Sequence, residues 1–157
     1  FGGFKYTHGT PFRRAIEEDL IDPKKYVILG LRGGLYNPDD LKWAIEQGIT
    51  IISTDKFYEI GMNETIKIIR DVLGDTPTYF TFDIDGIDPT FAPGTGTPEV
   101  GGISVREAQL IIRHLNSLNL IGADVVEVSP PFDVNNMTSL VGATIAFEIL
   151  CTMTKTN

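Results

Sequence analysis

Three aspartates follow one apolar run in this 157-residue sequence, at a spacing that could bind a cation. The run FTFDIDGIDP contains Asp83, Asp85 and Asp88, and a loop rich in glycine, proline and threonine comes after it. If the apolar run is a buried strand, Asp83 and Asp85 share one face, about 7 Å apart along the backbone. Two carboxylates near an apolar interior repel each other unless protons, basic groups or a metal balance their charge. Because carboxylate oxygens suit Mg, Ca or Mn, a divalent cation is the simplest explanation.

Other interpretations of the same aspartates are open at this point. Both could cap the loop that follows them, as aspartates often do in turns. An EF-hand calcium loop counted from Asp83 requires glycine at its sixth position and glutamate at its twelfth, where Asp88 and Gly94 stand. The tetrapeptide DIDG that begins at Asp83 resembles the nucleophile motif of dehalogenase-type phosphatases, which depend on Mg²⁺. No later acidic pair convincingly completes the magnesium site of such a phosphatase.

A longer stretch resembles the signature of the ureohydrolase family, which includes arginases and agmatinases. That signature reads S/T-F-D-x-D-x-x-D-P-x-x-x-P-x-T-G-T-P. Here it stands as TFDIDGIDP, from Thr81, and APGTGTPE, from Ala92. The PGTGTPE portion is more similar to the agmatinase and guanidinobutyrase branch than to the arginases. Two further segments, THGTPFRRAIEE from Thr7 and ADVVEVSPPFD from Ala123, also resemble family segments. The resemblance extends from Phe1 to the C-terminal helix and corresponds to the C-terminal half of the family.

The resemblance implies a role for each matching residue. Asp83 would bridge two metal ions, and Asp85 would bind one of them and take part in catalysis. Glu127 would pair with the guanidinium group of the substrate and take part in catalysis. This agrees with the cost of burying an unpaired glutamate in the apolar run DVVEV. His8 would act as a proton shuttle or substrate contact, and Thr97 would line the substrate pocket.

The resemblance also implies a reaction and a cofactor. Two Mn²⁺ ions, with Ni²⁺ or Co²⁺ as alternatives, would activate a water molecule for attack on the guanidinium carbon. The substrate would be a small cationic guanidino compound such as agmatine or guanidinobutyrate. Collapse of the tetrahedral intermediate would release urea and an amine. A histidine, with its usual pKa of about 6.5, could relay the proton that the amine needs.

Part of the family's metal site has no match in this sequence. Family members carry a Gly-Gly-Asp/Glu-His segment and an Asp-Ala-His-x-Asp segment upstream, and neither occurs among these 157 residues. The sequence contains 2 histidines, and neither matches an imidazole ligand of the family. We therefore expect the N-terminal part of the family fold to be missing and this chain alone to be catalytically impaired. A truncated, non-catalytic homologue that acts as a binding or assembly module is the alternative.

Apolar runs that alternate with helical patterns predict the elements that hold these residues. Four short apolar runs are typical of strands covered on both faces, at residues 26–31, 49–53, 78–84 and 120–128. Helices are predicted from Pro11, over 37–48, over 63–74, after the capping-box pattern Ser104–Glu107, and over 138–153. This order predicts a single α/β domain over residues 1–157. We expect a three-layer α/β/α arrangement with a mostly parallel sheet, similar to that of arginases.

Charge and composition exclude several classes of partner. The formal net charge of −8 repels nucleic acid and anionic lipid and attracts a cationic substrate. No apolar run reaches membrane-spanning length and no signal peptide is visible, so we expect no membrane association. The single cysteine, Cys151, fits a reducing compartment. We expect a cytoplasmic protein, or a mitochondrial one if the source is eukaryotic. An incomplete sheet exposes an edge and apolar surface, which favours a homo-oligomer; the family forms trimers or hexamers.

Overall fold

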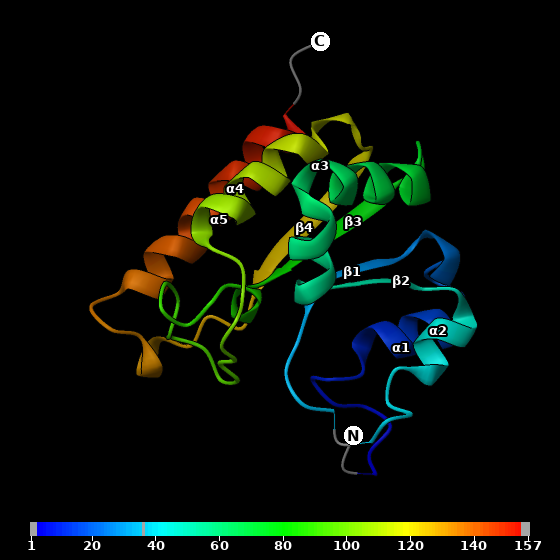
Figure 1. Cartoon of the computed structure of the whole chain (residues 1–157), viewed down its shortest axis with the longest axis horizontal. Coiled ribbons are helices and arrows are strands. Elements are labelled where there is room, and N and C mark those ends of the chain that lie inside the picture. Colours follow the sequence, from blue (N-terminus) through cyan, green and yellow to red (C-terminus); the bar gives the residue numbers. More distant parts are fainter. Residues whose placement is uncertain (1–2, 36, 155–157) are drawn as a thin grey trace.

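The computed structural model describes residues 3–35 and 37–154, which form strands between helices (Figure 1). In chain order the main elements are α1 (Pro11–Glu17), β1 (Val27–Leu31), α2 (Lys42–Gln47), β2 (Thr50–Ser53), α3 (Thr54–Leu73), β3 (Thr78–Asp83), α4 (Val105–His114), β4 (Leu120–Val126) and α5 (Met137–Met153). The predicted alternation of strands and helices is therefore confirmed. None of the described helices is long and apolar enough to cross a membrane.

All the strand pairing in the described residues is parallel, as predicted, but it forms two separate pairs. β1 pairs with β2, with Val27 opposite Thr50, and β3 pairs with β4, with Phe82 opposite Val125. In this part of the chain no ladder of hydrogen bonds joins β1 to β3, although Figure 1 shows β1 next to β3. A cavity of about 580 Å³ is lined by both strands. The expected continuous sheet is thus divided along one seam, which we define as the cavity between β1 and β3.

Helices lie on both sides of the strands. α4 packs on α5, α5 packs on β4, and α3 packs on β1 and β2. α1 and α2 lie on the other side of β1 and β2 from α3 (Figure 1), with Arg13 of α1 stacked 4.6 Å from the ring centre of Trp43 of α2. Tyr79 of β3 remains 56% exposed. The three layers expected from the sequence are present, and the layer made by α1 and α2 covers the β1–β2 pair.

The apolar core lies between α3, α4, α5 and the strands. The capping box predicted at Ser104 is confirmed, because its hydroxyl accepts from the Glu107 N–H at 3.1 Å and the Glu107 carboxylate accepts from the Ser104 N–H at 2.7 Å. This cap fixes the start of α4. The inward face of α4, together with α3, α5 and the strand ends, buries an apolar cluster. This cluster includes Phe57, Ile66, Ile84, Ile87, Ile103, Ala108, Ile112, Ile145 and Ile149.

Two predicted helix starts are wrong. α2 begins at Lys42 rather than at Asn37, because Asn37 starts a turn. Its side-chain oxygen accepts from the Asp39 N–H at 2.9 Å, and its own N–H donates to the Asp40 carboxylate at 3.0 Å. α3 begins at Thr54, well before residue 63, and it contains a kink at Gly61, where φ is 78°. The predicted helix over 63–74 is the portion that follows this kink.

Candidate active site

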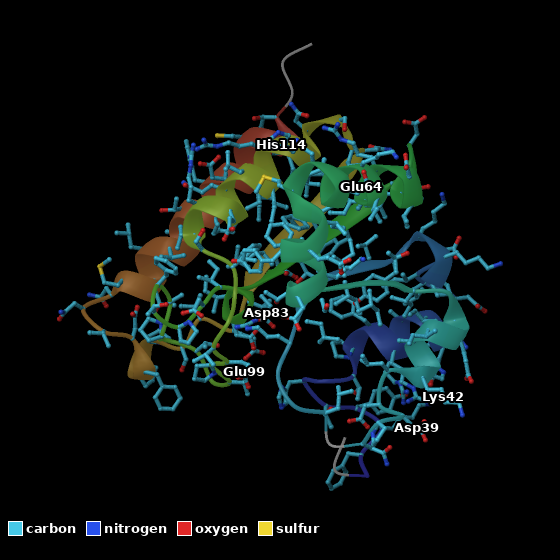
Figure 2. The ribbon with its side chains drawn as sticks, viewed as in Figure 1. Asp39, Lys42, Glu64, Asp83, Glu99 and His114 are labelled. Atoms are coloured by element: carbon cyan, nitrogen blue, oxygen red, sulfur yellow. The ribbon has the colours of Figure 1, made fainter. Side chains whose placement is uncertain are left out.

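Asp83 and Asp85 flank a deeply buried residue at the end of β3. Ile84 is 0% exposed, so it anchors the short 3-10 turn Ile84–Gly86 in the core. The Asp85 N–H donates to Oδ1 of Asp83 at 3.1 Å, and both aspartates line the cavity between the strand pairs. Figure 2 shows Asp83 near the centre of the molecule, at the same end of the strands as Glu99. The two aspartates therefore lie together, although Asp85 is in the turn after β3 rather than on the strand as expected.

The electrostatics of Asp83 indicate a site with excess negative charge. Burial, the charge of Asp85 and, less strongly, the charge of Glu127 raise the pKa of Asp83 to about 7, while the hydrogen bond from the Asp85 N–H acts in the opposite direction. Asp83 is nonetheless an exposed residue, and the water around it screens part of the repulsion. A bound cation would relieve the same repulsion, because an opposite charge favours the ionised carboxylate.

Glu127 lies directly after β4 in an unusual backbone conformation. The strand ends at Val126, two residues before the predicted end, because Glu127 has a φ of 63°. A residue with a side chain adopts this left-handed conformation at a cost on the order of 1–3 kcal/mol, and such strain concentrates at functional sites. Asp83 pairs with Val126 in the ladder, so Glu127 follows directly, and its charge contributes to the raised pKa of Asp83. Glu127 is exposed and does not line the cavity, so it is not the buried strand glutamate expected from the sequence. The end of β4 thus delivers a third acidic group toward the end of β3.

Thr97 contacts one of the candidate metal ligands. Its hydroxyl donates to Oδ2 of Asp85 at 2.9 Å, and Thr97 also lines the cavity. The predicted pocket position is therefore compatible with the structure, and the hydroxyl additionally orients the Asp85 carboxylate. Elsewhere the loop is held by the Gly94 N–H, which donates to the buried Thr138 hydroxyl at 2.8 Å.

Asp88, the third aspartate of the run, holds the loop rather than facing its neighbours. Its carboxylate accepts from the Thr90 hydroxyl, from the Thr90 N–H at 2.9 Å, and from the N–H groups of Gly101 and Gly102 at 2.7 and 3.1 Å. The bonds from Thr90, followed by those from the two glycines, lower the pKa of Asp88 to about 2. Asp88 is thus an anion that organises the turn.

Neither histidine lines the cavity that the paired aspartates line. His8 occupies an exposed turn before α1 and is not among the residues that line the cavity with Asp83, Asp85 and Thr97. Its role in proton transfer stays a prediction. His114 lies at the opposite end of the strands from Asp83 (Figure 2), with Nδ1 2.7 Å from the Leu110 carbonyl oxygen.

Sequence reasoning missed one residue near the site, Arg32. It follows β1 directly, and its guanidinium donates to the main-chain carbonyls of Asp85 and Glu99. A signal was available, because a basic residue just after a parallel strand lies at the same edge of the sheet as the ends of the other strands.

The donors at this site fit a hard divalent cation in kind but are few. Asp83 and Asp85 offer carboxylate oxygens, which suit Mn²⁺. Across residues 3–35 and 37–154, no group of three or more His, Cys, Asp or Glu side chains is placed to hold a metal ion. The two aspartates therefore fit part of a metal site, and further ligands are needed to complete it.

Comparison with known proteins identifies relatives along nearly the whole chain. Residues 1–152 match the arginase family. The chain is 57% identical to a guanidinopropionase of Pseudomonas aeruginosa over 151 residues, which are 96% of the chain and 48% of that protein. It is 46% identical to a guanidinobutyrase of the same organism over 151 residues, 96% of the chain and 47% of that protein.

Solved structures agree in fold. The structure of proclavaminate amidinohydrolase from Streptomyces clavuligerus superposes with a TM-score of 0.89 at 42% identity, covering 98% of this chain and 50% of that one. The predicted arginase-like fold is confirmed by this similarity. The chain spans about half the length of the curated relatives that it matches.

Proposed function

The chain belongs to the arginase family, and from this premise we propose that it is part of an enzyme that hydrolyses a guanidino compound to urea and an amine. The observation that carries the proposal is the pair Asp83 and Asp85 at the end of β3, with Glu127 directly after the paired end of β4. Asp83 and Asp85 lie within the family-like signature, and the charge of Glu127, just after β4, contributes to the raised pKa of Asp83. The family match also favours this interpretation of the aspartates over that of a dehalogenase-type phosphatase.

Asp83 and Asp85 are the residues that would hold metal. We propose Mn²⁺, two ions per complete site, with Ni²⁺ or Co²⁺ as alternatives. When bound, the ions would activate water for attack on the guanidinium carbon. Thr97 would keep Asp85 oriented through its hydrogen bond to Oδ2. Glu127 would hold the planar guanidinium by charge-assisted hydrogen bonds, which are stronger than neutral ones.

We propose a short guanidino acid as the substrate. The relatives at 57% and 46% identity are named guanidinopropionase and guanidinobutyrase, and both names point to a guanidinium at one end of a short acid. His8 is our candidate for the proton relay to the departing amine, since histidine titrates close to neutral pH.

We further propose that the protein is a cytoplasmic homo-oligomer. Support for self-association comes from the outer face of α5, where Leu140, Phe147 and Leu150 are exposed. Exposed apolar side chains gathered on one helix are more typical of an interface than of free surface.

The function is tested on the complete enzyme of which this chain is part, by measuring urea release with Mn²⁺ from 3-guanidinopropionate, 4-guanidinobutyrate, agmatine and arginine. We expect release from one of the guanidino acids, lost in Asp83→Asn and retained in Asp71→Asn, which changes an exposed aspartate of α3. Undiminished release from Asp83→Asn would contradict the proposal. A stable oligomer that binds no Mn²⁺ and releases no urea would instead favour a non-catalytic assembly module.

A further inference from the structure

One side chain, Arg32, joins the two strand pairs at their carboxyl ends. Nη2 donates to the carbonyl oxygens of Asp85 at 2.5 Å and Glu99 at 2.6 Å. Nε donates to the carbonyl oxygens of Glu99 at 3.1 Å and Val100 at 3.3 Å. Nη1 donates to the Gly30 carbonyl of β1 at 3.4 Å. A single guanidinium thus gathers main-chain carbonyls from three segments that are far apart in sequence.

Three of these carbonyls, those of Asp85, Glu99 and Val100, lie at the two ends of the loop over residues 86–102. Asp85 directly precedes the loop, and Glu99 and Val100 lie near its end. Between its ends the loop has little regular pairing: one bridge joins Ile87 to Ile103, and another joins Thr95 to Val128. The planar fork of arginine can donate several hydrogen bonds at once, which a lysine cannot reproduce. Arg32 therefore closes the loop at its base and ties it to β1.

We infer that Arg32 is a positioning residue that holds Asp85 and the loop carrying Thr97 in the geometry needed to bind the cation. The inference rests on the proposed function, because it concerns the same carboxylates. Asp85 is held from two sides: Arg32 binds its carbonyl oxygen, and Thr97 binds its carboxylate at 2.9 Å. Loss of Arg32 removes the hydrogen bonds to the main chain of Asp85 and to the far end of the loop together, while the Asp88 bonds and the Ile87–Ile103 bridge remain.

The arrangement positions the carboxylates without neutralising them. In the part of the chain that the structure describes, Arg32 forms no ion pair with an acidic side chain. Its hydrogen bonds go to neutral carbonyl oxygens instead. If Arg32 were a counter-ion to Asp83 or Asp85, its guanidinium would contact a carboxylate and would compete with a metal ion. Arg32 leaves the carboxylate oxygens available.

The test compares Arg32→Met with a matched control, Arg70→Met. Arg70 also uses Nη2 to bind a carbonyl oxygen, that of His114 at 2.6 Å, and it links α3 to the end of α4 away from Asp83 (Figure 2). The dissociation constant for Mn²⁺ is measured by calorimetry. We expect it to rise about tenfold or more in Arg32→Met, as for other residues that orient metal ligands. The control should stay within about twofold of the unchanged protein.

Hydrogen exchange gives a readout that does not depend on metal. The N–H groups of Gly101 and Gly102 bind Asp88, and their exchange should accelerate in Arg32→Met but not in Arg70→Met. Arg32→Lys, which keeps the charge, should be intermediate in both measurements, and it serves as the test variant if Arg32→Met does not fold.

If hydrogen exchange in Arg32→Met equals that of the wild-type protein, the positioning role is overturned. The same follows if the wild-type protein binds Mn²⁺ and Arg32→Met binds it with equal affinity. If the unchanged protein binds Mn²⁺ but releases no urea, the proposed function fails while the affinity comparison still decides the role of Arg32. If it binds no Mn²⁺, hydrogen exchange decides alone. Restoration of urea release in Arg32→Met by excess Mn²⁺ would support the inference, since a purely structural defect does not respond to metal.

Discussion

Asp83 is a carboxylate placed where its charge is disfavoured, at the end of a strand and beside two other acids. Its pKa of about 7 reflects burial first, then Asp85, and then Glu127. A protein gains nothing in stability from such an arrangement unless something positive binds there. The residue-scale predictions therefore concern this group.

Removing either acidic neighbour should lower the pKa of Asp83. Asp85→Asn should lower it more than Glu127→Gln, because Asp85 is the larger electrostatic cause. The pKa can be followed by carboxyl carbon NMR in metal-free protein. The reverse order, or no shift in either variant, would contradict the geometry described for the three carboxylates.

The raised pKa of Asp83 also predicts how the stability of the metal-free protein depends on pH. The folded state holds this proton more tightly than the unfolded state, whose value is near 3.8. Its contribution to stability is therefore fully present below about pH 4 and is lost as the pH rises through about 7. Urea unfolding with a chelator present should show this decline, and Asp83→Asn should flatten it between these two limits. Asp71→Asn, at an exposed site, should keep the profile of the unchanged protein.

At this scale, the sequence predicts the acidic pair but not everything around it. Asp83 and Asp85 lie together, but through the turn Ile84–Gly86 rather than through strand alternation, because β3 ends at Asp83 and the Asp85 N–H donates to Oδ1 of Asp83. Arg32 was missed because its partners are carbonyls of residues 85, 99 and 100, and main-chain acceptors have no signature in side-chain sequence. Thr97 was assigned to the pocket, whereas its contact with Asp85 depends on how a loop folds back.

At the scale of elements, the loop after β3 requires glycine at position 102, where it passes close to the main chain of Ile87 and Asp88. A Cβ on Gly102 would lie 2.5 Å from the nitrogen of Asp88 and 2.7 Å from the carbonyl carbon of Ile87, both main-chain atoms that cannot easily move. Gly102→Ala should therefore destabilise the protein by about 1–3 kcal/mol or more. Gly96→Ala, in the same loop, meets nothing within 4 Å and is the control. Equal midpoints in urea unfolding would contradict this account.

The attachment of the loop to α5 can be tested at Thr138. Its side chain is 0% exposed and accepts from the Gly94 N–H at 2.8 Å. Thr138→Val keeps the shape but leaves that N–H unpaired, at a cost of about 1–3 kcal/mol. In Thr144→Val the lost bond is a 2.8 Å contact to the Leu140 carbonyl of the same helix, so the change should stay within about 0.5 kcal/mol. Thermal or urea unfolding separates the two, and similar losses would count against a special role for Thr138.

Elements whose ends or strand character are marked by local sequence signals were predicted well. Elements whose limits depend on other contacts were not. The capping box of α4 and the β-branched runs of the four strands are local signals. The start of α2 was misplaced because Asn37 uses its side chain to form a turn, which competes with helix initiation. The first part of α3 was missed because Gly61 interrupts the helical pattern.

At the scale of the whole molecule, the outer face of α5 should mediate self-association. Phe147 is 66% exposed there, and Leu140 and Leu150 flank it on the same helix. Phe147→Asp should lower the mass measured by light scattering, because a carboxylate in an apolar interface is strongly disfavoured. Leu20→Asp, at a residue that is 74% exposed beyond α1, should not. If the wild-type protein is a monomer, or if the two substitutions lower the mass equally, α5 is not the interface.

The seam between β1 and β3 was not predicted, because the order of strands in a sheet follows from packing between distant segments. Within the described residues it is a direction of mechanical weakness. Among the described residues, no strand ladder crosses it, and Arg32 bridges it at the site. A pulling force applied between β2 and β4 would load side-chain contacts one after another, whereas a force along β3 and β4 would shear a parallel ladder all at once. Single-molecule stretching should therefore separate the two strand pairs before either pair comes apart.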